Sequence, residues 1–235
     1  MGSPSLTRPT MASDRSGTAQ AIRNVVIAAD GARLDGMLTL SASATRLVLF
    51  AHGSGSSRHS PRNTYVADVL NQAGVGTLLF DLLTAAEDHA YRTRFDISLL
   101  TSRLLAATDW ACKDADTAGL ALGYFGASTG AAAALAAAAA TDNPIAAVVS
   151  RGGRPDLAGA DALGRVMAPT LLIVGGRDDV VIDLNRAAYA SLRCEKALAI
   201  VPGATHLFEE PGTLEEAAAA ASAWFVRWLV PSRGT

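Results

Sequence analysis

A serine, an aspartate and a histidine each stand directly after an apolar run of the kind that forms a strand. Ser128 is the centre of Gly126-Ala127-Ser128-Thr129-Gly130, Asp178 follows the run 170–175, and His206 follows the run 197–201. A hydroxyl, an imidazole and a carboxylate in one hydrogen-bonded row can form and hydrolyse a covalent acyl intermediate. The sequence therefore predicts Ser128 as nucleophile, His206 as general base and Asp178 as the acid that orients the histidine.

The segment around Ser128 has the G-x-S-x-G pattern of a nucleophile elbow, a strained turn between a strand and a helix. Glycines on both sides let the strand and the helix approach without side-chain collision. The competing interpretation is a glycine-rich turn in which the serine caps the helix. Asp178 could likewise cap a helix that begins near Ile182, and His206 could be a half-buried loop histidine. The order Ser128, Asp178, His206, each after a separate strand, favours catalysis.

A fourth predicted strand end carries the segment Phe50-Ala-His-Gly-Ser-Gly-Ser-Ser57. In a serine hydrolase this loop supplies one amide of the oxyanion hole, which we assign to Ser54, and the residue after the nucleophile, Thr129, supplies the other. A phosphate-binding loop is excluded, because no Gly-Lys-Ser/Thr follows and the third glycine of G-x-G-x-x-G would fall at Arg58. His52 is expected to shape the loop through hydrogen bonds rather than act as a second base.

Arginines stand near two of these strand ends. Arg151 and Arg154 follow the run 145–150, and Arg58 and Arg62 lie beyond the expected oxyanion loop. One or more of these four could hold a substrate carboxylate in a bidentate pair, and Arg58, Arg151 and Arg154 are the candidate substrate-binding residues. Solvated or structurally paired arginines are the alternative.

The elements that must position these residues alternate along the chain from residue 22 onward. An antiparallel hairpin around Ala29-Asp-Gly-Ala32 is expected to precede a parallel sheet, because later apolar runs are separated by helical patterns. The final helix should begin with a capping box, Thr213-Leu-Glu-Glu216. The predicted strands are 22–29, 34–40, 46–52, 75–81, 120–125, 145–150, 170–175 and 197–201, and the predicted helices are 63–72, 96–114, 128–140, 182–192 and 213–229. This pattern predicts a three-layer α/β/α sandwich with a mostly parallel sheet of about eight strands.

Composition points to one domain with a largely aliphatic core. The chain has 235 residues, of which 50% are hydrophobic and 6% aromatic. Residues 22–235 are expected to form the domain and 1–21 a flexible extension that resembles neither a signal peptide nor an anchor. A net charge of −2 without a basic run disfavours nucleic acid and anionic membranes as partners. A small-molecule partner, a monomer or small homo-oligomer, and a cytoplasmic location are expected.

Neither the cysteines nor the histidines have metal-ligand spacing. Cys112 and Cys194 lie on segments that read as helical, and buried free thiols are expected there. The four histidines form no cluster with carboxylates or cysteines in the sequence. No metal and no organic cofactor is expected.

The segments AHGSGSS, GYFGASTGAA, LLIVGGRDDVV and VPGATHLFEEPG resemble α/β-hydrolases related to dienelactone hydrolases, over nearly the whole chain from about residue 22. The resemblance implies Ser128, Asp178 and His206 as the triad, and Ser54 and Thr129 as oxyanion donors. It favours Asp178 over its neighbour Asp179 as the acid of the triad, because Gly175-x-x-Asp178-x-x-Val181 is similar to the family spacing. Dienelactone hydrolases proper carry cysteine where this chain has Ser128, which favours an ordinary carboxyl ester as substrate.

The expected activity is therefore that of a serine esterase. No large cap is expected over the site, since only residues 154–168 separate the strand ending at Ser150 from the next strand. An acyltransferase or perhydrolase would use the same acyl-enzyme with another acceptor. A catalytically silent small-molecule receptor on the same fold is the alternative outside enzymes.

Overall fold

The structure is a computed structural model that describes residues 20–230. The extension expected over residues 1–21 lies outside the described residues, apart from Gln20 and Ala21, which already belong to the first strand. The helices that the structure describes include none long and apolar enough to cross a membrane.

One sheet of eight strands organises residues 20–230, in the spatial order β1-β2-β4-β3-β5-β6-β7-β8. β1 pairs antiparallel with β2, β2 pairs antiparallel with β4, and every later pairing is parallel. The strands are β1 (Gln20–Ala29), β2 (Ala32–Ser41), β3 (Arg46–Ala51), β4 (Gly76–Phe80), β5 (Ala121–Ala127), β6 (Ile145–Arg151), β7 (Thr170–Gly175) and β8 (Lys196–Val201). The predicted mostly parallel sheet with an antiparallel start is thus confirmed.

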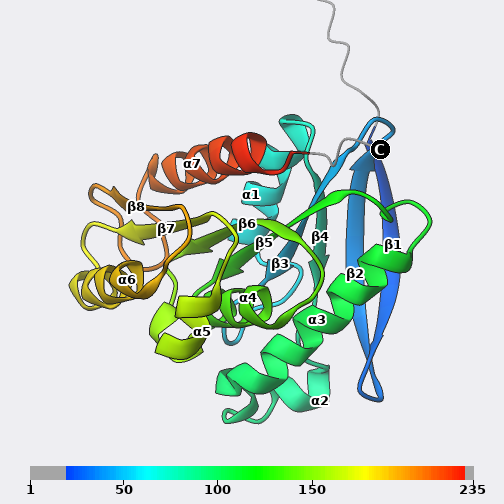
Figure 1. Cartoon of the computed structure of the whole chain (residues 1–235), viewed down its shortest axis with the longest axis horizontal. Coiled ribbons are helices and arrows are strands. Elements are labelled where there is room, and N and C mark those ends of the chain that lie inside the picture. The colour runs from blue at the N-terminus through cyan, green and yellow to red at the C-terminus, as the bar shows by residue number, and fades with distance from the viewer. Residues whose placement is uncertain (1–19, 231–235) are drawn as a thin grey trace, which may run out of the picture.

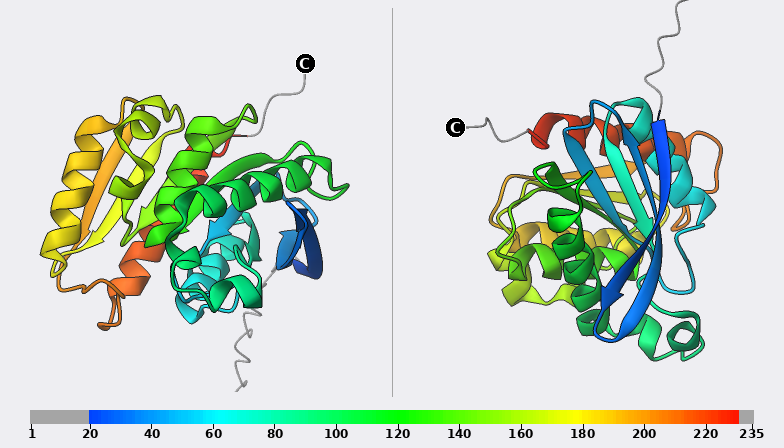
Figure 2. Two further views of the ribbon diagram at one scale, coloured as in Figure 1. Left: turned by 90° about the horizontal axis from the view of Figure 1, so that it is seen from below. Right: turned by 90° about the vertical axis from the view of Figure 1, so that its right-hand side faces the viewer.

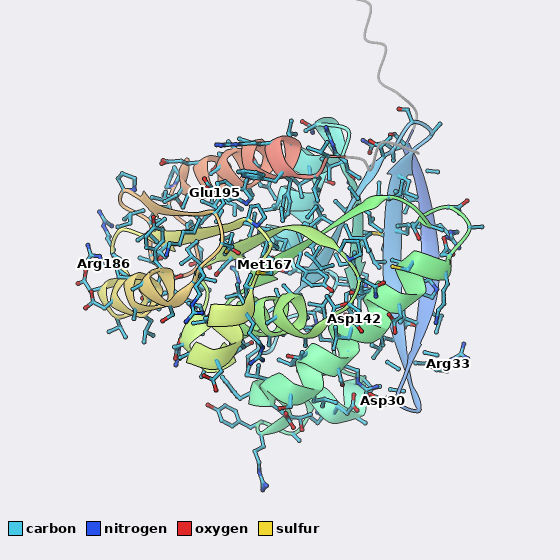
Figure 3. All side chains as sticks on the ribbon, viewed as in Figure 1. Asp30, Arg33, Asp142, Met167, Arg186 and Glu195 are labelled. Atoms are coloured by element: carbon cyan, nitrogen blue, oxygen red, sulfur yellow. The ribbon has the colours of Figure 1, made fainter. Side chains whose placement is uncertain are left out.

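The β1–β2 hairpin stands at one edge of the sheet (Figure 2), and Asp30 lies at its tip (Figure 3). Ala29 pairs with Ala32, so the loop has two residues. Asp30 has φ +46° and Gly31 φ +79°. Positive φ at both central residues is the requirement of a type I′ turn, whose twist matches that of the strands.

Helices cover both faces of the sheet (Figure 1). α1 and α7 lie on one face, and α3, α4, α5 and α6 lie on the other. The helices are α1 (Pro61–Gln72), α2 (Ala85–Asp88), α3 (Ile97–Lys113), α4 (Thr129–Ala140), α5 (Ala160–Arg165), α6 (Asp179–Ser191) and α7 (Thr213–Trp228), with 3-10 turns η1 (Thr93–Phe95) and η2 (Pro155–Ala158). Between β6 and β7 only η2 and α5 occur, so this segment of the described chain forms no cap domain.

The central helix α4 is almost entirely alanine and packs against strands and helices at once. Its residues from Thr129 to Leu135, and Ala137, are buried. A helix that is apolar all round is stable only when surrounded by protein, and small side chains let its backbone lie close to its neighbours. This close packing sets the position of the residue that precedes α4, Ser128.

Three local predictions need correction. Thr213 does not cap α7: Gly212 precedes the helix in the left-handed conformation, and the Thr213 hydroxyl donates to the Glu210 carbonyl at 2.7 Å. A capping box instead starts α2, where Thr84 and Glu87 each bond the other's backbone. Cys194 lies in the loop after α6 rather than on a helix, and both Cys112 and Cys194 are half-buried rather than buried.

Candidate active site

Ser128 sits at a strained turn between β5 and α4. Its φ of +51° and ψ of −120° are unusual for a residue with a side chain. The backbone around it is held from β6, because the Ser128 amide donates to the Arg151 carbonyl at 3.3 Å and the Arg154 amide donates to the Ser128 carbonyl at 3.1 Å. The turn therefore presents the Ser128 side chain as a nucleophile elbow would, and does not use it as a helix cap.

Two glycines make this turn possible, each against a different neighbour. A Cβ on Gly126 would lie 2.4 Å from the Cα of Ala131, inside α4. A Cβ on Gly130 would lie 2.1 Å from the carbonyl oxygen of Ala51 and 2.5 Å from that of His52. Gly126 thus allows strand and helix to meet, as the sequence predicts, whereas Gly130 allows α4 to meet the end of β3.

The loop after β3 passes directly beside the nucleophile. A Cβ on Gly53 would lie 3.0 Å from the Cβ of Ser128. Among residues 20–230, the backbone amides of Ser54 and Thr129 have no hydrogen-bond acceptor. Thr129 is the first residue of α4, where amides lack an intrahelical partner. Two unused donors therefore flank Ser128, the arrangement that an oxyanion hole requires.

Asp178 and His206 are hydrogen-bonded to each other. Nδ1 of His206 lies 2.7 Å from Oδ2 of Asp178. Asp178 precedes α6 but makes no capping bond with its side chain, and Asp179, in the first turn of that helix, is exposed. The carboxylate of Asp178 is therefore committed to the histidine, and it leaves Nε2 as the ring nitrogen free to accept a proton.

Backbone contacts between the ends of β7 and β8 bring these two residues together. The Gly176 amide donates to the Val201 carbonyl at 2.8 Å, and the Arg177 amide to the Ala204 carbonyl at 2.9 Å. A Cβ on Gly175 would lie 2.5 Å from the Ala204 oxygen, so only glycine permits this approach. Gly175 is thus required by the geometry of the loop that carries His206.

Ser128 and His206 line one cavity of about 220 Å³. Their side chains face this space without a direct hydrogen bond between the Ser128 hydroxyl and the His206 ring in the described structure. The His206 side chain is 38% exposed and that of Asp178 16%. The cavity is lined by Gly53, Ser54, Ser56, Ser60, Arg62, Asn63, Ala127, Ser128, Arg151, Gly152, His206 and Leu207. A larger cavity of about 340 Å³ lies at the β1–β2 hairpin, away from these groups.

His52 supports the loop that carries the Ser54 amide. Its Nε2 accepts a hydrogen bond from the Leu82 amide at 3.0 Å, and its Nδ1 lies 3.0 Å from the carbonyl oxygen of Gly53. Because the ring must accept at Nε2, it is neutral and donates at Nδ1. Burial lowers the pKa of His52 below its ordinary value. This is the loop-shaping arrangement that the sequence predicts.

Of the three arginines proposed for substrate binding, the structure brings only Arg151 to the cavity. Arg58 instead pairs with Asp81, with Asp35 at 3.7 Å, and Arg154 forms a two-bond pair with Asp156 at 2.8 and 2.9 Å. Neither Arg58 nor Arg154 lines the cavity. Each carboxylate compensates a guanidinium where the fold places it, so these two side chains have a structural role.

The cavity is also lined by Asn63, which the sequence did not indicate, and by Arg62, which it indicated only as one of the nearby arginines. Asn63 is 2% exposed, and its side-chain oxygen accepts a hydrogen bond from Arg151 at 3.3 Å. Arg62 precedes it in the first turn of α1 and forms a 3.3 Å ion pair with Glu209 at the surface. The sequence indicated a helix near residue 63, but nothing in it connects Asn63 with a strand end 88 residues away.

Within residues 20–230, no three His, Cys, Asp or Glu side chains are grouped so that they could hold a metal ion. The cavity offers hydroxyls, amides, an imidazole and two guanidinium groups. Groups of these kinds are able to support acyl transfer and to bind anions.

A family model and several solved structures match this chain. The model of the "Alpha/beta hydrolase domain" family matches residues 44–224. The crystal structure of a dienelactone hydrolase from Anabaena variabilis is similar with a TM-score of 0.87 and 55% identity, over 90% of this chain and 99% of that one. Est1E from Butyrivibrio proteoclasticus has a TM-score of 0.75 at 18% identity, over 87% of this chain and 98% of its own. At that identity the likeness to Est1E concerns the fold.

Two longer relatives come from Mycobacterium tuberculosis, strains CDC 1551 / Oshkosh and H37Rv. Both are provisionally named phosphoribosyl transferase and are 60% identical to this chain over 194 residues, which is 83% of this chain. The chain spans 44% of the length of these relatives. Their name describes proteins more than twice as long as the aligned stretch.

Replacing Gly130 by alanine tests the close packing at the elbow. The Gly130→Ala change should destabilise the protein by about 3 kcal/mol, at the upper end of overpacking effects, because the new methyl group meets two carbonyl oxygens of the β3 end. Gly164→Ala is the matched control: its Cβ would meet only Arg193 Nε, at 4.0 Å. In urea unfolding the control should be neutral or stabilised by up to about 1 kcal/mol. Equal stability of both variants would contradict the packing argument.

His52 should make stability depend on pH. Folding needs the neutral ring, whereas the unfolded chain takes up a proton below an ordinary pKa of about 6.5. The unfolded state therefore binds more protons, and the free energy of unfolding should fall as the pH drops from about 6.5 towards 5. Urea unfolding should show this loss reduced in His52→Gln and retained in the exposed control His59→Gln. A loss of equal size in His52→Gln would assign it to another group.

Proposed function

The chain belongs to the alpha/beta hydrolase domain family, and from that premise we propose that it is a serine hydrolase that cleaves a small carboxyl ester. The observation that carries the proposal is the 2.7 Å hydrogen bond between Asp178 and His206 at the cavity that Ser128 also lines. A strained turn for Ser128 and two unused amides beside it add support.

In the proposed acylation, the Ser128 hydroxyl rotates onto Nε2 of His206 and attacks the ester carbonyl as the imidazole takes its proton. Asp178 keeps the proton of His206 on Nδ1 and stabilises the imidazolium that forms. The amides of Ser54 and Thr129 donate to the tetrahedral oxyanion; one such donor is typically worth about 3 kcal/mol of transition-state stabilisation. The C–O bond then breaks, and His206 returns the proton to the departing alcohol.

Deacylation repeats these steps with water in place of serine. His206 removes a proton from water as it attacks the acyl-enzyme, and the same amides hold the second oxyanion. The acid product leaves and Ser128 recovers its proton. The chain's own groups supply every proton transfer in this cycle.

The named relatives bear on the bond that is cleaved. A dienelactone hydrolase 55% identical to this chain acts, by its name, on a lactone, which is an internal ester. Ser128 stands where dienelactone hydrolases proper carry cysteine, so we infer a carboxyl ester as the substrate class. The phosphoribosyl transferase name of the longer relatives is not carried over, because this chain spans 44% of them.

Ser128→Ala should abolish ester hydrolysis. The expected loss is about a million-fold in kcat, because the variant has neither nucleophile nor acyl-enzyme. The measurement is the turnover of p-nitrophenyl esters of graded chain length, and of lactones, by wild type and variant. A fluorophosphonate should label wild type at Ser128 and leave the variant unlabelled. Unchanged turnover in the variant, or an unreactive Ser128 in wild type, would remove the hydrolase proposal in favour of another site or a receptor.

Asp178→Asn should lower kcat by roughly 10⁴-fold, since an amide holds the imidazole in the wrong tautomer. Asp179→Asn is the matched control, one residue along, and should change kcat by less than about threefold because its side chain is solvent-exposed. The same p-nitrophenyl ester serves for both variants. If Asp179→Asn shows the larger loss, the assignment of the acid is reversed.

The acceptor of the acyl group needs a separate measurement. Product analysis in the presence of an alcohol, an amine or hydrogen peroxide distinguishes hydrolysis from acyl transfer and perhydrolysis. Free acid as the main product in all three mixtures is expected.

A further inference from the structure

Arg151 is a buried cation without a carboxylate partner in the described structure. The residue is 7% exposed, and its one side-chain hydrogen bond is the 3.3 Å contact from Nη2 to the neutral Asn63. Nη1 is buried with no partner among residues 20–230. Phe125 and Phe208 flank the guanidinium, with ring centroids 5.9 and 5.8 Å from Cζ. A buried charge with unused donors is costly unless an anion completes it.

The lining of the cavity adds a second cation near Arg151 and contains no carboxylate. The twelve residues that line the cavity include Arg62 and Arg151 and no aspartate or glutamate. Asp178 does not line the cavity and is hydrogen-bonded to His206, and Glu209 pairs with Arg62 at the exposed rim. Burial, with added repulsion from Arg62, lowers the pKa of Arg151 to about 10.

The N-terminus of α1 opens into the same cavity. Ser60 caps this 12-residue helix, its first turn has no acidic residue, and Ser60, Arg62 and Asn63 all line the cavity. A helix N-terminus carries a partial positive charge that favours an anion. In this turn of the described chain the Arg62 amide is the free donor, because Pro61 has no N–H and Ser60 accepts from the amides that follow Arg62. Together with the unpartnered Nη1 of Arg151, this gives three sources of positive potential on the side of the cavity formed by β6 and α1.

We propose that Arg151, Arg62 and the N-terminus of α1 form a subsite for a phosphate group carried by the ester substrate. This inference rests on the proposed function, because the phosphate would hold the substrate beside Ser128. The bond that is cleaved is the C–O bond of the carboxyl ester. The phosphate is a binding group and is not transferred.

Charge selects phosphate over a carboxylate. A phosphate monoester carries close to two negative charges at neutral pH, because its second pKa is about 6. Two guanidinium groups with a helix N-terminus match two charges, and the fork of Arg151 matches a tetrahedral group with several acceptor oxygens. A carboxylate would compensate Arg151 alone and leave Arg62 with its exposed partner Glu209.

The direct test is the binding of inorganic phosphate to the whole chain by isothermal titration calorimetry at constant ionic strength. Wild type and Ser128→Ala should bind phosphate alike, and sodium acetate should bind at least about tenfold more weakly. Arg151→Met should weaken phosphate binding by roughly 10- to 100-fold, as expected for a lost charge-assisted contact. Arg154→Met is the matched control: it removes the same charge three residues away, from a guanidinium paired with Asp156, and should bind like wild type.

Stability measurements guard against a folding artefact. Without phosphate, Arg151→Met should melt at or above the temperature of wild type, because methionine fits between Phe125 and Phe208 without a buried charge. Phosphate should raise the melting temperature of wild type and leave that of Arg151→Met unchanged. Arg62→Met, at a half-exposed position, is the second variant and should weaken phosphate binding by about two- to fivefold.

A kinetic comparison links the subsite to the reaction. With p-nitrophenyl 3-phosphonopropionate, kcat/KM should exceed that with p-nitrophenyl hydrogen succinate in wild type, and the preference should disappear in Arg151→Met. Equal phosphate affinity in Arg151→Met and Arg154→Met, or acetate binding as tight as phosphate, would overturn the subsite. Arg151-dependent phosphate binding in a protein that hydrolyses no ester would instead overturn the proposed function and keep the subsite.

Discussion

At Gly130 the first turn of α4 meets the end of β3 so closely that one added methyl group would lie 2.1 Å from a carbonyl oxygen. The rest of the site depends on this contact. It holds the start of α4, with the Thr129 amide, against the loop after β3, and between them Ser128 has a φ of +51°, which a residue with a side chain seldom adopts. The alanines of α4 extend the same principle along the helix, because larger side chains would lift it from the sheet.

Charge is treated in two different ways around the cavity. Asp178 and His206 are joined by a short hydrogen bond. Arg58 and Arg154 each form an ion pair with an aspartate, Asp81 and Asp156 respectively. Arg151 is the exception, since it is buried against two aromatic rings and one amide oxygen. A fold gains nothing in stability from such a group, so its presence is best understood through what it binds. At the end of β6, stability would thus favour an uncharged side chain, whereas anion binding requires the guanidinium of Arg151.

The sequence predicted the parts of the fold that depend on local pattern. All eight strands begin and end within about two residues of their predicted bounds, because runs such as 170–175 are apolar throughout and end at glycine or a polar residue. The Ser-Asp-His order predicted which strand ends would meet. Pairings between distant side chains had no such signal: Arg58 finds Asp81 across 23 residues, and Arg151 finds Asn63 across 88. The residues of the capping box at Thr84 and Glu87 are visible in the sequence, but the helix they begin has four residues and no apolar periodicity that would predict it. The capping box expected at Thr213 does not form, because Gly212 precedes the helix in the left-handed conformation.

The short link between β6 and β7 has a kinetic consequence. With only η2 and α5 in that stretch, no segment there must move aside before a molecule reaches Ser128. Arrival would then be governed by diffusion in the positive field of Arg62 and Arg151, which accelerates the encounter with anions and weakens as salt is added. Water would enter such an open cavity as readily as substrate, so an acyl group on Ser128 would be short-lived. The chemical steps, rather than a conformational change, would then limit the rate of turnover.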